Sequence, residues 1–302
     1  METKELITEF SKTRPDASII VGYGSEVKRQ ANDKGLEKQI DLILGVEDAT
    51  SWHKLNHEIN PNDYRSEIGY RLLPIYGNLG TKINYLSHLP FEGHMFKIGV
   101  VNTKDLISDL INWKTFFLAG RIQKPIELVK SNCELDYAIK INRMNALKTS
   151  LLALNKNEVT EEELFTVLCS LSFVGDWRNI MHVENKDKVK NIVEGSFAEL
   201  HNIYNEFNNG FYEIDSQNKI VINYEKLLLK LDSLPEPLKS KVLIYILDEK
   251  FDIESLSNLR KIILNHFIGI NIRTSAVQPL KGLVLNGFGK TMTYLNQKLE
   301  KK

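Results

Sequence analysis

A single acidic residue stands inside a strongly apolar run of this 302-residue chain. Residues 39–46 read Gln-Ile-Asp-Leu-Ile-Leu-Gly-Val, which predicts a buried strand that carries Asp41. Burial of an unpaired carboxylate costs several kcal/mol, so an acid in such a strand normally binds a cation. Asp41 is therefore the first candidate for a catalytic and metal-binding residue.

A second apolar run, residues 18–24, ends at Gly24, and Ser25 follows it. The run predicts a buried strand that leads into a tight turn. Glycine permits close backbone approach, so the amides of Gly24 and Ser25 could hold a phosphate. Asp41 on the adjacent strand could then hold the Mg²⁺ that bridges the oxygens of a triphosphate. The residues also leave a structural alternative open, an ion pair between Asp41 and Lys28, Arg29 or Lys38.

This order of apolar strand, Gly-Ser, spacer and apolar-Asp-apolar strand resembles the nucleotidyltransferase fold of DNA polymerase beta. The resemblance implies attack on an α-phosphorus, with pyrophosphate as the leaving group. That fold usually carries Asp-x-Asp, which places two carboxylates on one strand face. Here Ile43 occupies the second position, so the remaining metal ligands are not identified.

The elements that must position these residues form an α/β first part and a mainly helical second part. In the first part we predict a further strand at 96–101, a helix that starts at Asp48 or Ser51, and a helix over 105–117. After Lys124-Pro125 the sequence pattern changes from short apolar runs to long helical patterns. In the second part we predict helices over 136–154, 161–171 and 238–247, and a hairpin that pairs 210–213 with 219–223. The fold class is α+β, with domains at 1–125, 126–230 and 231–302.

Composition excludes several classes of protein. Lys and Arg number 39 and Asp and Glu number 39, and this balance argues against a nucleic-acid-binding protein. The two cysteines, Cys133 and Cys169, lack CxxC spacing, which excludes a zinc ribbon and fits a reducing compartment. No apolar run approaches the ~18 residues of a membrane span. With no signal or transit peptide at the N-terminus, we expect an intracellular chain that is at most peripheral on a membrane.

Motifs along nearly the whole chain resemble one family, the mitochondrial translocator assembly and maintenance proteins. These are phosphatidate cytidylyltransferases (CDP-diacylglycerol synthases) with bacterial relatives. The motifs occur at residues 22–27, 40–48, 51–56, 97–101, 106–113, 118–125, 171–178, 272–275 and 281–282, with Gly80 and Asn84 between them.

The resemblance implies that CTP and phosphatidic acid give CDP-diacylglycerol and pyrophosphate, with Mg²⁺ as the cofactor. It also implies a nucleotidyltransferase domain, a winged-helix domain and a C-terminal region that helps to contact the membrane. The hairpin near residues 210–223 would be the wing. Because that family often lacks the second strand acid, Ile43 does not contradict the assignment.

Several basic residues are candidates for phosphate binding. Lys97 lies in an otherwise apolar strand and would neutralise phosphate charge beside Asp41; its structural alternative is a lysine at a strand edge. Arg121 and Lys124 would bind the nucleotide or cap the preceding helix. Three more residues are predicted to bind the phosphatidate headgroup, since arginine forks match phosphate: Arg178, Arg273 and Lys281. An interdomain ion pair is the alternative for the two arginines.

Two further residues near the first site have structural interpretations. His53 follows Trp52 in a quoted motif, and a packed or surface histidine is favoured over a catalytic base. Asp48 stands an odd number of residues from Asp41, so on a continuous strand it would face the other way, and a helix cap is favoured over a metal ligand.

The final stretch, residues 287–302, has apolar residues at helical spacing opposite lysines, and it predicts a helix that lies on an anionic membrane. We expect a cytoplasmic enzyme at the inner face of the cell membrane, or the matrix face if the chain is a trimmed mitochondrial protein. No nucleic acid and no obligatory protein partner are expected. The alternatives are a nucleotidyltransferase of the same fold with a protein, RNA or small-molecule acceptor, and a non-catalytic membrane-binding module.

Overall fold

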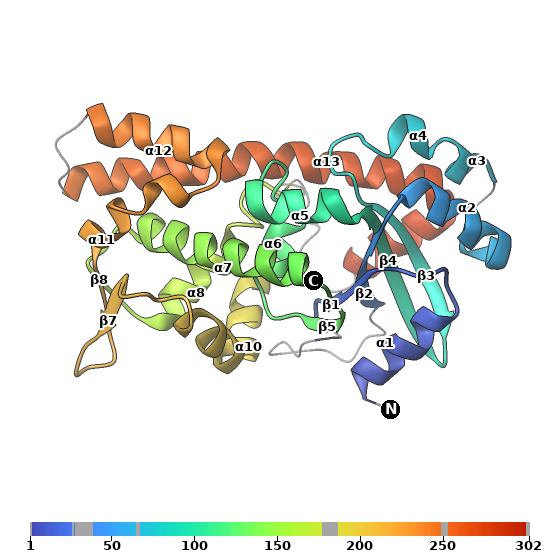
Figure 1. Cartoon of the computed structure of the whole chain (residues 1–302), viewed down its shortest axis with the longest axis horizontal. Coiled ribbons are helices and arrows are strands. Elements are labelled where there is room, and N and C mark those ends of the chain that lie inside the picture. The colour runs from blue at the N-terminus through green and yellow to red at the C-terminus, as the bar shows by residue number, and fades with distance from the viewer. Residues whose placement is uncertain are drawn as a thin grey trace.

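The computed structural model describes residues 2–25, 27, 39–64, 67–176, 187–248 and 253–299, without the side chains of 247–248, 253–256 and 287–299. The first part of the chain forms a five-stranded mixed sheet in the order β3-β4-β2-β1-β5 (Figure 1). β2 and β4 are parallel and the other neighbours are antiparallel. The strands are β1 (Ile19–Tyr23), β2 (Gln39–Val46), β3 (Asn84–Phe91), β4 (His94–Asn102) and β5 (Glu127–Lys130).

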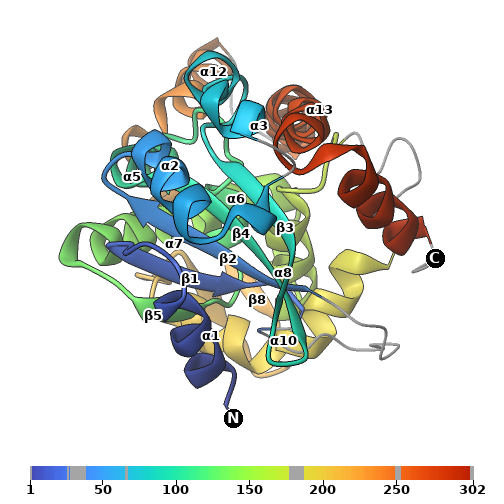
Figure 2. The same cartoon turned by 90° about the vertical axis from the view of Figure 1, so that its right-hand side faces the viewer.

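Helices cover both faces of this sheet (Figure 2). On one face, Leu42 and Ile98 pack with α1 (Thr3–Lys12) and α2 (Ala49–Ile59). On the other face, Ile43 and Val101 pack with α5 (Thr103–Asn112) and the first half of α7 (Cys133–Leu154). Because side chains alternate along a strand, Asp41 and Lys97 lie on the second face, with α5 and α7.

Most predicted elements of the first part are confirmed, and one boundary is wrong. The strands at 19–23, 39–46 and 96–101 are present, and the Asp48 carboxylate caps α2 by accepting a hydrogen bond from the Ser51 amide at 2.7 Å. The helix predicted over 105–117 ends at Asn112, because Trp113 adopts a left-handed conformation with φ 52°. The short elements η1 (Pro61–Asp63), α3 (Glu67–Arg71) and α4 (Leu73–Tyr76) follow α2.

The second part is mainly helical around a small three-stranded sheet in the order β6-β8-β7. Its hairpin is the predicted one: β7 (Tyr212–Ile214) pairs with β8 (Ile220–Ile222). β6 (Glu158–Val159) completes the sheet. The remaining elements are α6 (Ala119–Ile122), α8 (Glu161–Ser170), α10 (Lys188–Asn205), α11 (Tyr224–Leu228), η2 (Leu231–Ser233) and α12 (Glu236–Asp248).

One long helix, α13 (Ile253–Leu299), runs along the helical part and reaches the sheet (Figure 1). Asn271 donates hydrogen bonds to the carbonyls of Leu171 and Val174 in the helical part. Further along, Asn286 accepts from the Ser87 amide at 3.0 Å and donates to the Tyr85 carbonyl at 2.8 Å. The sequence predicted a terminal helix within residues 287–302, and the structure shows that this helix already begins at Ile253. α7 and α13 contribute to cores in both parts, and the boundaries at 125 and 230 stay predictions.

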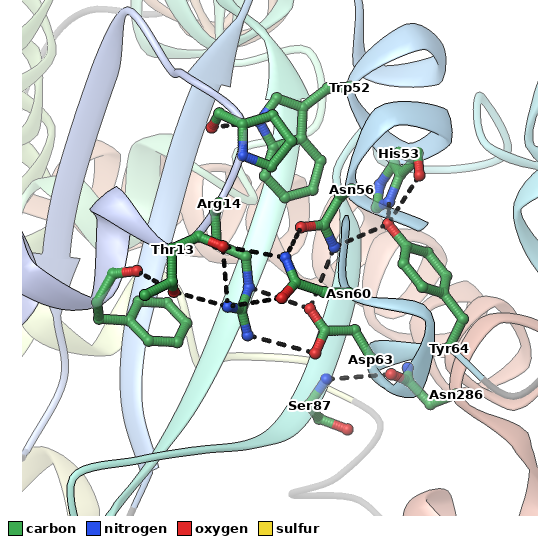
Figure 3. A network of polar contacts seen from close by, with 12 residues as sticks. Thr13, Arg14, Trp52, His53, Asn56, Asn60, Asp63, Tyr64, Ser87 and Asn286 are labelled. Carbon is green, nitrogen blue, oxygen red and sulfur yellow. Dashed lines mark hydrogen bonds and ion pairs between the residues drawn. The ribbon is translucent and has the colours of Figure 1, made fainter. Parts of the chain in front are cut away.

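A buried polar network fixes α2 against the end of α1 (Figure 3). Arg14 Nε lies 3.0 Å from Asp63 Oδ2, which also accepts from Asn56 Nδ2 at 3.1 Å. Tyr64 Oη lies 2.9 Å from His53 Nδ1. Burial lowers the pKa of His53 to about 3, so the ring is neutral at physiological pH. Because α2 covers the sheet face opposite Asp41, His53 is the packed histidine that the sequence favoured.

Candidate active site

Asp41 and Lys97 are direct neighbours in the sheet. The parallel register of β2 and β4 places Asp41 opposite Lys97, and Lys97 Nζ lies 2.9 Å from Asp41 Oδ1. Both side chains are partly open to solvent, with 27% exposure for Asp41 and 17% for Lys97. Lys97 therefore points toward Asp41, as its predicted role requires. The partners considered from the sequence, Lys28, Arg29 and Lys38, lie outside the described residues.

Gly24 approaches the other carboxylate oxygen of Asp41. β1 pairs with β2 so that Tyr23 faces Asp41, and the chain then turns at Gly24 with φ 88°. A Cβ atom at Gly24 would lie 3.4 Å from Asp41 Oδ2 and would force a strained backbone, so glycine fits this turn. Ser25 follows in the same turn and is half-buried. The Gly24–Ser25 turn and Asp41 are thus adjacent in space.

Two tyrosines from neighbouring strands lie beside this pair. The hydroxyls of Tyr23 and Tyr85 are 3.3 Å apart, and Lys97 Nζ lies 4.5 Å from the centre of the Tyr85 ring. Burial raises the pKa of both tyrosines, so both hydroxyls stay protonated near neutral pH. Sequence reasoning did not select them. Tyr23 lies inside the motif at residues 22–27, whereas nothing in the local sequence distinguished Tyr85.

Arg121 lies in α6, and Lys124 follows shortly after the end of this helix. The Arg121 guanidinium lies 3.6 Å from the centre of the Phe117 ring and 6.0 Å from that of Tyr23, and it donates to the Phe117 carbonyl. Lys124 Nζ donates to the Gly120 carbonyl and, at 2.8 Å, to Ser172 Oγ. These carbonyls belong to α6 and the residues just before it, whereas the preceding long helix α5 ends at Asn112, so these contacts do not cap α5. The binding of nucleotide by both side chains stays a prediction.

Lys188, at the start of α10, extends this basic group. Its Nζ lies 5.5 Å from the centre of the Phe173 ring, and Lys124 Nζ lies 5.1 Å from the same ring. Burial, together with the charges of Arg121 and Lys188, lowers the pKa of Lys124 to about 8. No motif in the sequence pointed to Lys188. We call Arg121, Lys124 and Lys188 the basic group. Its residues come from α6, the segment after it and the start of α10.

The side chain of Asp109 in α5 binds the loop that precedes Arg121. Its buried carboxylate accepts hydrogen bonds at 2.6–3.2 Å from the Thr115 hydroxyl and from four backbone amides, those of Thr115, Phe116, Leu118 and Ala119. These amides lie at and before the start of α6, where an anion is favoured. Asp109 thus acts as a positioning residue for Arg121.

Of the three residues predicted to bind the lipid phosphate, the structure describes Arg273 and Lys281. Arg178 lies outside the described residues, and Arg273 is exposed on α13. Lys281 is buried and donates to the carbonyls of Gly77, Thr81 and Ile83 at 2.6–3.0 Å. These contacts give Lys281 a structural role, and a role at the lipid phosphate stays a prediction for all three.

The described residues fit a magnesium ion that is held mainly by its substrate. No cluster of three or more His, Cys, Asp or Glu side chains occurs among them. Mg²⁺ commonly binds one or two carboxylates and completes its shell with water and substrate phosphate. Asp41 supplies one partly exposed carboxylate next to a turn that a phosphate can approach.

Comparison with known proteins identifies the family. The family model described as "Phosphatidate cytidylyltransferase, mitochondrial" matches residues 3–301. The protein with this description from Schizosaccharomyces pombe is 36% identical over 208 residues, which are 67% of this chain and 53% of the relative. The Xenopus laevis protein is 29% identical and the Mus musculus protein 30% identical, each over 95% of this chain and 90% of the relative. The chain thus spans about half of the fission-yeast relative and most of the other two.

One solved structure is also similar, a nucleotidyltransferase-like protein from Exiguobacterium sibiricum. It covers 98% of this chain and 79% of its own, at 12% identity and a TM-score of 0.24, which is too low to establish a common fold. The match of the family model over residues 3–301 confirms the resemblance that the motifs indicated. This chain belongs to the mitochondrial-type phosphatidate cytidylyltransferase family, and it is a nucleotidyltransferase that produces CDP-diacylglycerol.

Proposed function

We propose that Asp41, Lys97 and the Gly24–Ser25 turn form the centre at which CTP reacts with phosphatidic acid. The observation that carries this proposal is the contact of Asp41 with Lys97 on one side and with Gly24 on the other. A carboxylate for a cation, an ammonium for phosphate charge and a turn open to phosphate oxygens are the groups that phosphoryl transfer requires. The sheet would then belong to a polymerase-beta-like nucleotidyltransferase domain, and the β7–β8 hairpin to a winged-helix-like domain.

The reaction is an in-line displacement. An oxygen of the phosphatidate phosphate forms a bond to the α-phosphorus of CTP, and the bond to the bridging oxygen breaks, so pyrophosphate leaves. A phosphate monoester has a second pKa of about 6, so the attacking group is already ionised at neutral pH and needs no strong general base. Lys97 neutralises phosphate charge, and the amides of Gly24 and Ser25 bind the departing pyrophosphate. Bound Mg²⁺, held by Asp41, would supply further neutralisation of the triphosphate.

The direct test is conversion of labelled CTP on vesicles that contain phosphatidic acid, with and without Mg²⁺. CDP-diacylglycerol and pyrophosphate should form together, and ATP, GTP and UTP should react poorly. Transfer of the nucleotide to a protein, RNA or small alcohol in place of phosphatidate would contradict the proposal. A measurement of the same rates after Mg²⁺ removal by a chelator tests the cofactor by itself.

We expect Lys188 to bind phosphate charge. Substitution Lys188→Met should raise the KM for CTP about fivefold to tenfold with little change in kcat, because the residue contributes a charge to binding. Lys190→Met is the matched control on the same helix, since Lys190 is 65% exposed and lies 3.7 Å from Glu194. Equal effects of the two substitutions on the KM for CTP would show that Lys188 does not bind phosphate charge at this site.

Binding should weaken at alkaline pH because of Lys124. Its pKa of about 8 means that the protonated, phosphate-binding form is lost as pH rises through that value. We therefore expect kcat/KM for CTP to fall across this range. Lys124→Arg should flatten the profile, because a guanidinium stays charged. A pH profile that is unchanged in the variant would show that another group titrates.

The lipid substrate requires a membrane. We propose a peripheral enzyme that binds an anionic membrane surface, at the inner face of a bacterial membrane or at the matrix face in a mitochondrion. The described helices include none that is long and apolar enough to cross a bilayer. The side chains of residues 287–302, where the sequence predicted a membrane-binding helix, lie outside the described residues.

A further inference from the structure

A stripe of apolar side chains faces solvent on α3, α4 and the turn that follows. Ile68 is 66% exposed, Leu72 38%, Ile75 74% and Leu79 57%. The spacing of these residues is helical, and in a globular domain such a stripe normally faces the core. Here the core contact of α4 is made by Leu73 instead.

α13 lies beside α3 (Figure 2) and carries further exposed apolar side chains. Ile272 is 40% exposed, Leu280 65% and Val284 38%. The two segments touch: a Cβ atom at Gly69 would lie 2.9 Å from the Val284 carbonyl oxygen, and one at Gly80 would lie 3.1 Å from Val277 Cβ. We call these seven exposed side chains the α3–α13 surface. Contiguous exposed apolar surface of this kind usually marks an interaction site.

The basic charge beside the α3–α13 surface comes from Arg273. The sequence from Ser255 to Leu299 contains no Asp or Glu to balance it, and Lys281 in the same helix is buried. Arg273 is exposed beside Ile272. On the other segment, Glu67 is balanced by Arg71, at 2.6 Å. Among the described side chains, the surface thus combines apolar residues with the positive charge of Arg273.

We infer that the α3–α13 surface lies in the headgroup layer of the bilayer that supplies the lipid substrate. Apolar side chains beside basic residues bind anionic interfaces through both apolar burial and charge. A second copy of this chain is a poorer occupant, because a two-fold contact would place the same basic helix against itself. The inference rests on the proposed lipid chemistry, and it adds α3 and α4 to the membrane contact expected of residues 287–302.

Flotation of the full chain with vesicles tests the inference without CTP. Phosphatidylcholine vesicles that contain phosphatidic acid should bind the unaltered chain, and the double variant Ile75→Glu, Leu79→Glu should bind at least about tenfold more weakly. Leu229→Glu is the matched control, since Leu229 is 76% exposed in the helical part. A second variant on the other helix, Leu280→Glu, should repeat the loss. Unchanged binding of either variant, or an equal loss in the control, would overturn the inference.

Two further measurements separate this surface from the reaction centre. With a short-chain phosphatidate dissolved as monomers, the double variant should keep the turnover of the unaltered chain and lose it only on vesicles. Loss of turnover on both substrates would show that Ile75 and Leu79 contribute to folding or catalysis and not to membrane binding. Sedimentation gives the mass: a dimer that becomes a monomer in the double variant would show that a second copy covers the surface. Flotation uses no nucleotide, so its result is independent of the role of Asp41.

Discussion

Asp41→Asn should reduce the formation of CDP-diacylglycerol by about a thousandfold or more while the chain remains folded. The substitution keeps the shape of the side chain and removes the negative charge that would hold Mg²⁺ and pair with Lys97 at 2.9 Å. Lys97 keeps its charge in this variant, so phosphate binding should persist while turnover is lost. The measurement is the initial rate of CTP conversion on phosphatidate vesicles, together with a thermal unfolding curve.

Asp48→Asn is the control for this experiment. Asp48 caps α2 and lies beyond the end of the same strand, and asparagine is also a good cap. We expect nearly unchanged turnover. If Asp41→Asn retained near-normal turnover, the reaction centre would lie elsewhere, although the family assignment would stand.

Asp109→Ala should destabilise the fold by about 3 kcal/mol or more. The carboxylate accepts four amide hydrogen bonds and one hydroxyl hydrogen bond in a buried position, and alanine leaves those donors without it. The loop before α6 would lose its geometry, and Arg121 its position beside Tyr23. Denaturant unfolding measures the first effect, and the KM for CTP reports the second.

Two comparisons make the Asp109 result specific. Asp109→Asn keeps one acceptor oxygen and should lie between alanine and the unaltered chain. Asp105→Ala, on the same helix, removes a more exposed carboxylate that lies 2.6 Å from Lys82, so it should cost less than about 1 kcal/mol. Equal destabilisation by the two alanine variants would refute the positioning role of Asp109.

The sequence alone determined the elements whose signals are local. The run around Asp41 defined β2 to the residue, because alternation and apolar content are read within a few positions. The start of α2 was placed at Asp48 or Ser51 for the same reason, and Asp48 is the cap. The hairpin of β7 and β8 followed from two short apolar runs joined by turn residues. The family was identified from motifs spread along the chain, and the match over residues 3–301 bears this out.

The end of α5 could not be predicted from local pattern. Apolar spacing continued to Phe117, but the Asp109 carboxylate captures the amides that would otherwise continue the helix. Hydrogen bonds that amides up to ten residues away donate to one side-chain carboxylate are set by how the loop packs. Helical periodicity does not report it.

The assembly of the site was decided by strand order. Lys97 reaches Asp41 because β4 pairs in parallel with β2, and Tyr85 reaches Tyr23 because β3 and β1 flank that pair. Lys188 joins Lys124 only through the packing of α10 near Phe173. Lys281, selected as a phosphate ligand, is instead surrounded by three carbonyl oxygens because α13 lies against the chain that enters β3. Residue type and spacing thus specified which groups can do chemistry, whereas contacts between residues far apart in the sequence determined which of them meet.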